Sequence, residues 1–494
     1  YNTGLSDDIQ KKSINTTMFK RYMGKRQTMG LTLGMEYKLT AGSRLLFRGM
    51  WNKFNDIRPV SESYIDYNNS RYQYNYRYSH YQTAIRGGEL GGEHQWGERL
   101  KLDWSVSDYV SEYFLETPPT YGTKGLPIAT FRQKITGGFS NLSSDGKRYW
   151  SFDAPDGKGD TPMTFDAGLK NPAETMSPDK LQLQQLVIAQ LDNREHDRNV
   201  QLNLTVRAAK NLQFKFGGKY RHKFRESTYG SSIVFMPGAA LGVPNAPALL
   251  TLGGLETAAP ARGAEFFGQM AGSHAQYQMD PLTKNQLFDL YSAASLTKNG
   301  FVDVTPKTNP TALYHGTEQV ASAYAMAEYQ ASDRLRIVGG IRNEYTDMEL
   351  TGSKATTAGT PPATTISPTR VVNRYNALLP MVHLRYTLKP DAIIRAAYTR
   401  TFVRPNFGDM TPGTSVDNSK SPMTITQGNP DLRPTFSDNF DLMGEYYFTN
   451  IGLLSGGVFH KQIRDVVFTN MQMQVIDGNN YLVTQAKNLQ NASL

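Results

Sequence analysis

Residues 200–224, VQLNLTVRAAKNLQFKFGGKYRHKF, alternate apolar and polar side chains in two successive runs. The first run extends from Val200 to Val206 and the second from Leu212 to Arg221, with an apolar residue at nearly every second position. Side chains on a β-strand point alternately to opposite faces of the sheet. The segment therefore predicts two strands, joined by a turn at Ala208–Asn211, that each have one apolar face and one basic face.

This period of two recurs along the whole chain. Clear examples are residues 31–38, 100–107, 334–342 and 382–388, where apolar side chains again occupy every second position. Runs of this kind have the length of a strand that crosses a membrane. We predict strands at approximately residues 29–38, 43–55, 72–90, 99–115, 183–207, 212–226, 317–330, 334–349, 372–388, 392–405, 435–448, 452–468 and 480–490.

The connections between the predicted strands alternate between short and long. The short ones are tight turns at Thr40–Gly42, Ala208–Asn211, Ala331–Asp333, Lys389–Asp391 and Thr449–Ile451. The long ones are rich in Pro, Gly, Ser and Thr and cover about 116–182, 227–316, 350–371 and 406–434. Short periplasmic turns and long extracellular loops are typical of outer-membrane barrels. The sequence therefore predicts an all-β fold, an antiparallel transmembrane β-barrel, with the apolar face toward lipid and the basic face toward the lumen.

The composition is that of a protein with a modest buried interior. Only 39% of the 494 residues are hydrophobic, and the mean hydropathy is −0.50. No run of apolar residues is long enough for a transmembrane helix. The chain contains no cysteine, which excludes a disulfide scaffold and any thiolate site. A soluble β-sandwich is the main alternative fold, but its strands average about five or six residues, and several of the predicted strands are much longer.

Aromatic residues are predicted to form two girdles at the edges of the apolar band. One group lies on the apolar face within a few residues of the tight turns, and the second lies about one hydrocarbon thickness further along the strands. The first group contains Tyr37, Tyr329, Tyr386 and Phe448, and the second contains Trp51, Tyr220, Tyr345 and Tyr398.

Basic residues are predicted to line the lumen. They are Lys215, Lys219, Arg221, Arg334, Arg336 and Arg342, and few acidic residues share their strands. The net charge of +9 could indicate nucleic acid or an anionic membrane surface. These strands lack the interleaved stacking aromatics of a nucleic-acid-binding sheet, so we do not expect a nucleic-acid partner.

No catalytic site or cofactor site is predicted. The eight histidines show no HExxH or paired metal spacing, and no glycine-rich phosphate loop is present, so we do not expect an enzyme. The segment SFDAPDGKGD places Asp153, Asp156 and Asp160 in one loop, where their carboxylates could bind calcium. The spacing does not match an EF-hand, so a solvated loop without metal is the alternative.

The long loops are expected to carry specificity, because loops on a rigid scaffold usually hold the recognition residues. The longest, 227–316, contains DPLTKNQLFDLYSAAS, in which Asp280 could cap a short helix that begins at Pro281. Leu282, Leu287, Leu290 and Tyr291 would give this helix an apolar side. Such a loop could fold as a lid over the mouth of the barrel.

The C-terminal part of the sequence resembles the barrel of TonB-dependent outer-membrane receptors. The resemblance is carried by Leu378–Pro380, the pair Arg404 and Pro405, the run GNPDLRP and the strand Glu445–Phe448, with GIRNEYT at Gly340–Thr346 upstream. The GNPDLRP run contains Gly428, Asn429, Pro430, Arg433 and Pro434. The order and spacing of these elements over about 130 residues are specific to the family, while each element alone is not.

The resemblance implies a barrel of about 22 strands that encloses a plug domain and draws energy from the TonB complex of the inner membrane. Only about thirteen strands are recognised here, and neither a plug nor a TonB-contact segment is found, so we expect residues 1–494 to form part of a barrel wall. The plug would then supply carboxylates to the basic lumen. The other expected partners are outer-membrane lipid and lipopolysaccharide, and the TonB complex, contacted through a segment outside the chain.

The resemblance implies a receptor in the outer membrane of a Gram-negative bacterium that imports a scarce nutrient, such as a siderophore, cobalamin, a glycan or a peptide. The alternative is a plugged barrel that serves as a structural or secretion partner and is closed by a surface lipoprotein lid.

Overall fold

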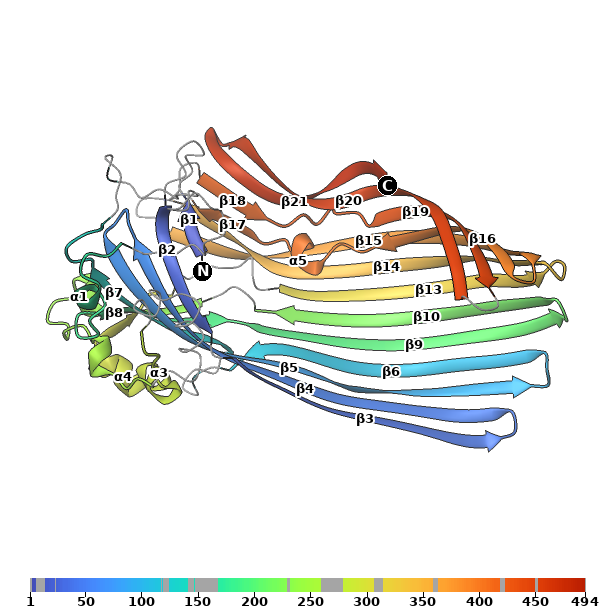
Figure 1. The fold of residues 1–494 in the computed structure, drawn as a ribbon, viewed down its shortest axis with the longest axis horizontal. Helices are drawn as coiled ribbons and strands as arrows, with labels where there is room; N and C mark the ends of the chain where they lie inside the picture. The colour runs from blue at the N-terminus through green and yellow to red at the C-terminus, as the bar shows by residue number, and fades with distance from the viewer. Residues whose placement is uncertain are drawn as a thin grey trace.

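The main body is a long antiparallel sheet, which we call the wall (Figure 1). The computed structural model describes residues 2–5, 14–22, 24–116, 118, 124–140, 146, 168–228, 232–258, 279–305, 314–358, 363–417, 423–448 and 452–493. Each strand of the wall pairs with the one before it. In order they are β3 (Lys25–Thr40), β4 (Ser43–Asp66), β5 (Arg71–Trp96), β6 (Leu100–Leu115), β9 (Asp192–Ala209), β10 (Leu212–Ser227), β13 (Tyr314–Gln330), β14 (Leu335–Ala358), β15 (Ala363–Lys389), β16 (Ala392–Val403), β19 (Thr435–Phe448), β20 (Gly452–Ile476) and β21 (Asn479–Ser493).

The strand register divides the wall into two chemically different faces. Leu102, Leu204 and Phe216 lie side by side across β6, β9 and β10, and therefore on one face. Large apolar side chains on this face are open to solvent, with Leu202 52% and Val458 70% exposed. We call this side the apolar face and the opposite side the polar face. The alternation predicted from the sequence is confirmed in these strands.

Tight turns join neighbouring wall strands at one end, which we call the turn end. The longer connections lie at the other, the loop end (Figure 1). Three connections at the loop end are short as well, including residues 359–362 between β14 and β15. Another joins β4 to β5 at 67–70, and the third joins β20 to β21 at Asp477 and Gly478, both of which have positive φ angles. An Asp-Gly pair with this backbone conformation is the preferred two-residue hairpin turn.

Strands β4 and β20 run past their predicted ends, to Asp66 and Ile476, and two further segments differ from the sequence prediction. Residues 183–207 are two strands, β8 (Gln182–Gln190) and β9, and only β9 belongs to the wall. The segment 350–371, predicted as a loop, is largely strand, because β14 extends to Ala358 and β15 begins at Ala363. The predicted loops 116–182, 227–316 and 406–434 do connect wall strands, and each contains short helices or strands of its own.

The strands β4 and β5 are so long that they continue past the wall into a further part of the same sheet, which we call the loop-end sheet. β4 pairs with β3 as far as Ile57 and with β2 (Ile14–Tyr22) from Val60 onward. β5 likewise pairs with β6 along residues 81–96 and with β7 (Gly125–Lys134) along residues 71–77. The sheet continues through β8 to β11 (Ser232–Pro237) and β12 (Phe301–Asp303), and β1 (Asn2–Leu5) pairs with β2.

The loop-end sheet has its own hydrophobic core. Tyr72, Tyr74, Phe131 and Leu186 are completely buried in it. The helices α3 (Lys284–Leu290) and α4 (Ala293–Lys298) contribute Leu287, Leu290, Tyr291 and Leu296 to the same core. Two shorter helical segments, α1 (Pro172–Thr175) and η2 (Leu252–Gly254), adjoin it, and η1 (Gly238–Leu241) follows β11. The loop 227–316 therefore helps to build a folded domain.

The helix predicted in this loop exists, with its apolar side buried as expected, but its start is corrected. The N-cap of α3 is Thr283, whose hydroxyl accepts a hydrogen bond from the Gln286 amide at 3.1 Å. The helix thus begins three residues after Pro281, and Asp280 is not its cap. Among the described residues no helix is both long and apolar enough to cross a bilayer.

Candidate functional site

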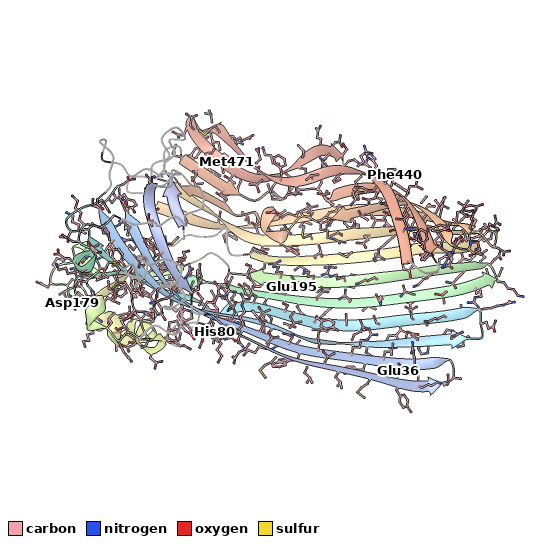
Figure 2. The ribbon with its side chains drawn as sticks, in the orientation of Figure 1. Glu36, His80, Asp179, Glu195, Phe440 and Met471 are labelled. Carbon is pink, nitrogen blue, oxygen red and sulfur yellow. The ribbon has the colours of Figure 1, made fainter. Side chains whose placement is uncertain are left out.

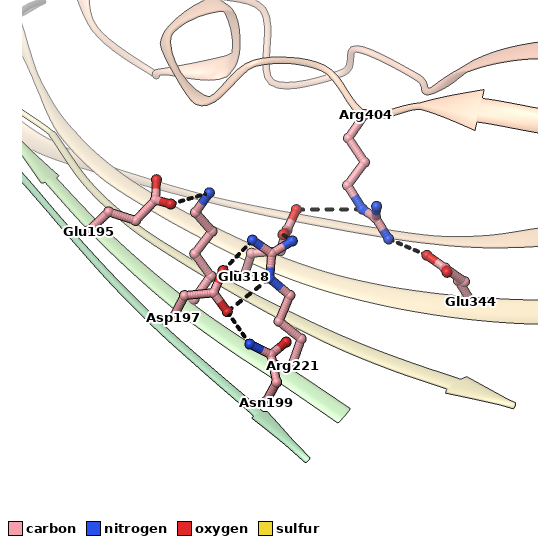
Figure 3. A network of polar contacts seen from close by, with 8 residues as sticks. Glu195, Asp197, Asn199, Arg221, Glu318, Glu344 and Arg404 are labelled. Atoms are coloured by element: carbon pink, nitrogen blue, oxygen red, sulfur yellow. Dashed lines mark hydrogen bonds and ion pairs between the residues drawn. The ribbon is translucent and has the colours of Figure 1, made fainter. Parts of the chain in front are cut away.

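The most extensive charged network of the wall lies on the polar face, near the loop end of β9, β10, β13 and β14 (Figure 3). The guanidinium of Arg221 donates from Nε to both carboxylate oxygens of Asp197, at 3.1 and 3.0 Å. The same guanidinium lies 3.9 Å from Glu318 on β13. Beside it, Lys223 pairs with Glu195 at 2.7 Å. Adjacent strands thus supply opposite charges to each other.

The network continues to Arg404, which follows β16. Its guanidinium lies 3.6 Å from Glu318 and 2.5 Å from Glu344 (Figure 3). Glu344 also accepts from Arg342 at 2.6 Å. Glu318 is only 5% exposed. A buried carboxylate is tolerated when cations and hydrogen bonds compensate its lost hydration. Arg404 therefore holds the start of a long connection against two carboxylates of the polar face.

That connection, residues 404–434, packs against the polar face through a small apolar cluster. Helix α5 (Phe407–Met410) buries Phe407 and Met410 against Leu350 and Tyr314. A Cβ placed on Gly316 would come within 2.7 Å of the Phe407 ring, so glycine is required there for this close approach. The β17–β18 hairpin (Thr414–Asp417 and Met423–Gln427) then links β14 to β21, which have four other strands between them in the wall.

The GNPDLRP run fastens this connection to three wall strands. The Asn429 side chain donates to the Ala486 carbonyl on β21 at 2.9 Å. From β15, Asn373 donates to the carbonyls of Pro430 and Leu432 at 2.9 and 3.2 Å. The run ends Leu432–Arg433–Pro434, and Arg433 pairs with Asp465 on β20. The sequence marked these residues as a family signature, and the structure adds what they contact.

Glycine is required at Gly428, the first residue of this run. A Cβ at this position would lie 2.0 Å from the Thr411 carbonyl oxygen, so any larger residue would push α5 away from the run. Pro405 directly follows Arg404 and precedes α5.

The predicted lumen residues lie on one face. The register places Lys215, Lys219, Arg221, Arg336 and Arg342 on the polar face, and Arg334 precedes β14. Neighbouring strands supply carboxylates that the sequence did not place: Arg221 and Arg336 pair with Asp197 on β9 and Glu328 on β13, and Arg342 pairs with Glu344 on its own strand. Within the part of the chain that the structure describes, no ion pair involves Lys215, Lys219 or Arg334.

The predicted aromatic residues all share the apolar face. Tyr220 and Tyr345 flank Ala321 in one row across β10, β13 and β14. By the same register, Tyr37, Tyr329, Tyr386 and Phe448 lie on this face near the tight turns, and Trp51 and Tyr398 lie on it nearer the loop end. Their role at membrane boundaries stays a prediction. The proposed calcium ligands Asp153, Asp156 and Asp160 lie outside the described residues.

One polar cluster was not predicted. His80 on β5 pairs through Nδ1 with Glu116, just after β6, and Glu116 also accepts from Lys284 of α3 at 3.0 Å. The Lys284 ammonium lies 5.0 Å from the ring centres of both Tyr78 and Phe288. Burial raises the pKa of Glu116, but the hydrogen bonds from His80 and Lys284 outweigh it and leave this pKa below its ordinary value. Figure 2 labels His80 where the wall meets the loop-end domain.

The fold and the polar-face network define the chain as part of a large β-barrel wall with a domain at one end. The family model described as TonB dependent receptor-like, beta-barrel, matches residues 130–493, well over half of the chain. The chain therefore belongs to the TonB-dependent receptor family, whose members are transport receptors in the outer membrane of Gram-negative bacteria.

Solved structures with a similar fold share little sequence with the chain. The ferric-catecholate import receptor Fiu from E. coli K12 is 11% identical, with 96% of this chain and 60% of that chain covered and a TM-score of 0.42. The siderophore receptor PiuA from Acinetobacter baumannii is 10% identical, with 95% and 59% covered and a TM-score of 0.40. The Serratia marcescens hemophore receptor HasR is 9% identical, with 98% and 60% covered and a TM-score of 0.38. The chain thus spans about 60% of their lengths, and no curated protein matches it.

Proposed function

We propose that the chain forms much of the barrel of an active importer in the outer membrane of a Gram-negative bacterium. The importer would take up a scarce nutrient, such as a siderophore, cobalamin, a glycan or a peptide, with energy from the TonB complex. Family membership over residues 130–493, together with a wall that is apolar on one face and ion-paired on the other, carries this proposal.

The two faces support a membrane location. Exposed Leu, Val and Phe side chains on the apolar face would cost free energy in water, at about 25 cal/mol per Å² of apolar surface, and would gain the same on contact with lipid. The polar face would line a lumen that holds a plug domain. The ion pairs around Glu318 and Glu344 compensate the charges of Arg221, Arg342 and Arg404. Such a locally compensated surface is better suited to packing against another protein than to lining an open anion pore.

Transport would need no covalent chemistry in this chain. The loop-end domain would capture the nutrient at the cell surface, and a plug inside the wall would rearrange when TonB pulls on it. The connection 404–434, held by Arg404 and the GNPDLRP run, would stabilise the mouth of the wall during that movement.

An uptake experiment on the full-length receptor tests the proposal. A strain that lacks the gene would be compared with its complemented strain for growth on limiting iron chelates, cobalamin, glycans and peptides. Uptake of one class should depend on the gene and should stop when a protonophore removes the energy source of TonB. Normal uptake of every class in the deletion strain, with loss of an assembled surface complex, would instead indicate the structural or secretion role with a lipoprotein partner.

A further inference from the structure

Two arginines share one carboxylate on the apolar face of the wall. Arg400 on β16 donates from Nε to Asp438 on β19 at 2.7 Å and from Nη2 at 3.1 Å. Arg464 on β20 pairs with the same carboxylate, and the Tyr398 hydroxyl donates to it at 2.9 Å. The register places Arg400 opposite Asp438, directly beside the row of Tyr398 and Phe440, so the group lies on the apolar face.

The carboxylate is buried and the two arginine side chains are partly exposed. The Asp438 side chain is 7% exposed, whereas those of Arg400 and Arg464 are 30% and 43% exposed. One negative charge therefore orients two positive charges, and the group carries a net positive charge at its surface. Asp438 is occupied by its partners, and within the described residues no other carboxylate pairs with Arg400 or Arg464.

Arg400, Asp438 and Arg464 form a triad that lies between two sets of aromatic rings. On the side of the turn end, the ring centres of Tyr398 and Phe440 lie 5.0 Å apart, and the His460 ring centre lies 6.5 Å from that of Phe440. On the side of the loop end, Phe402 and Phe436 stack at 5.7 Å. Beyond the Tyr398 row the face continues as Leu442 and Val458 toward the turn end. Figure 2 labels Phe440 on the wall.

This position combines an apolar band, an aromatic row and a surplus of guanidinium groups. Aromatic rows mark the boundary between hydrocarbon and headgroups on transmembrane barrels. Arginine binds phosphate through parallel N–H donors, with geometric selectivity that a single ammonium lacks. We propose that Arg400 and Arg464 bind a phosphate group of a phosphorylated glycolipid in the outer leaflet. This proposal rests on the proposed function, because it requires the apolar face to contact lipid.

The same face offers a matched comparison. Arg374 on β15 pairs with Asp347 on β14 at 3.0 Å, and its side chain is 61% exposed. The register places this pair directly beyond Tyr345 on the apolar face. One carboxylate compensates one guanidinium there, so Arg374 is more exposed than either arginine of the triad but has no surplus charge. Exposure alone would favour Arg374 as a phosphate site, whereas the charge argument favours the triad.

The test uses the full-length receptor, extracted in mild detergent and analysed by native mass spectrometry with added bisphosphorylated lipid A. Four variants are compared with the parent: R400Q, R464Q, the double R400Q/R464Q, and the control R374Q. We expect the double variant to bind the lipid at least about tenfold more weakly, each single variant to fall between, and R374Q to bind like the parent. R400K should recover only part of the binding, because lysine keeps the charge but not the planar fork.

Two ligand arms define the source of the phosphate. The dephosphorylated lipid should bind the parent and the double variant equally, and inorganic phosphate at millimolar concentration should compete only weakly, because it lacks acyl chains. The proposal would be overturned if the double variant bound bisphosphorylated lipid A as well as R374Q does. It would also be overturned if the parent bound the dephosphorylated lipid as tightly as the bisphosphorylated one. Heat modifiability on gels, measured on each sample, shows that the barrel is folded.

The result can be separated from a failure of the proposed function. Arginine substitutions on the two faces of β9, described below, test whether the apolar face contacts lipid. If they confirm the orientation and the double variant still binds lipid normally, only the phosphate site is wrong. If both substitutions on β9 cost the same, the membrane orientation itself is wrong.

Discussion

The ammonium group of Lys284, on helix α3, lies 3.0 Å from the carboxylate of Glu116, one residue beyond the wall strand β6. Together with His80 of β5, this pair joins the loop-end domain to the wall. The two side chains come from segments 168 residues apart in sequence. The domain is thus held in a defined position by charge as well as by its apolar core.

Replacing Lys284 with methionine should loosen helix α3 from the wall. Hydrogen bonds to charged groups contribute about 1.5–3 kcal/mol, and partial exposure of both side chains reduces this to about 1 kcal/mol. Hydrogen exchange of the α3 amides should become faster while exchange in β9 and β10 stays unchanged. K298M is the control, since no ion pair of Lys298 is found among the described residues. Equal effects of both variants would exclude a specific role for the pair.

The contact between Glu116 and Lys284 should weaken in acid. The pKa of Glu116 is lower in the folded protein than in the unfolded chain, so its ionised form stabilises the fold. That contribution is fully present above about pH 4.3, the ordinary value for glutamate, and is lost as the pH falls through the lower folded pKa. Exchange of the α3 amides, corrected for intrinsic rates, should therefore accelerate below this pH. In E116Q the acceleration should be absent, and its persistence would assign the effect to other groups.

The apolar face should tolerate charge much less than the polar face. Arginine in place of Leu204 or Ile337 should destabilise the inserted protein by about 2–4 kcal/mol if these positions lie near the middle of the bilayer. Arginine at the neighbouring Thr205 or Val338 should cost much less. Reversible folding into lipid vesicles, followed against urea concentration, measures the difference. Equal costs on the two faces would disprove the orientation.

The wall was predictable because its signal is local. Alternation and tight turns are read from consecutive residues, and strands such as β10 and β19 needed only their own sequence. The loop-end sheet was not predicted because its pairings, such as Tyr74 of β5 with Phe131 of β7, join distant segments. The alternating run Tyr72, Tyr74, Tyr76 and Tyr78 was included in a predicted strand, but its sequence does not show that these tyrosines are buried.

The polar site was predicted only in part for a similar reason. The side chains of Arg221, Arg336 and Arg342 were placed on the correct face by alternation, yet their carboxylate partners depend on register. The register of β9 and β10 places Asn199 directly opposite Arg221. Asp197 is two residues from Asn199 on the same face, so its carboxylate can contact Arg221. Counting charges along one strand cannot reveal such a partner. The boundary between β8 and β9 was missed because no Gly or Pro separates them.

The loop end should be accessible from outside the cell and the turn end should not. The chain has no cysteine, so a single engineered cysteine can be labelled selectively. An impermeant maleimide on intact cells should react with V243C in the loop 227–316 and not with K210C in the turn Ala208–Asn211. Both should react after the outer membrane is permeabilised. Labelling of K210C with V243C protected would invert the topology.

Replacing Arg404 with glutamine should destabilise the connection 404–434 and the polar face together. Of the cations in the described residues, Glu318 would then keep Arg221 alone, at 3.9 Å, and Glu344 would keep Arg342 alone. Removing one partner of a buried ion pair costs about 3–5 kcal/mol, and the partial exposure of Arg404 places the expected loss of unfolding free energy near 3 kcal/mol. The thermal unfolding midpoint should fall, and the larger antibiotics should leak through the barrel in cells. R404K restores the charge without the planar fork and should recover part of the unfolding midpoint and part of the antibiotic exclusion.

The control that separates this site from the rest of the basic face is R334Q/R336Q, since Arg336 pairs with Glu328 near the turn end, far from Arg404. If R404Q leaves the unfolding midpoint and antibiotic exclusion unchanged while ligand binding at the cell surface is lost, the network belongs to the substrate path and does not hold the mouth of the wall.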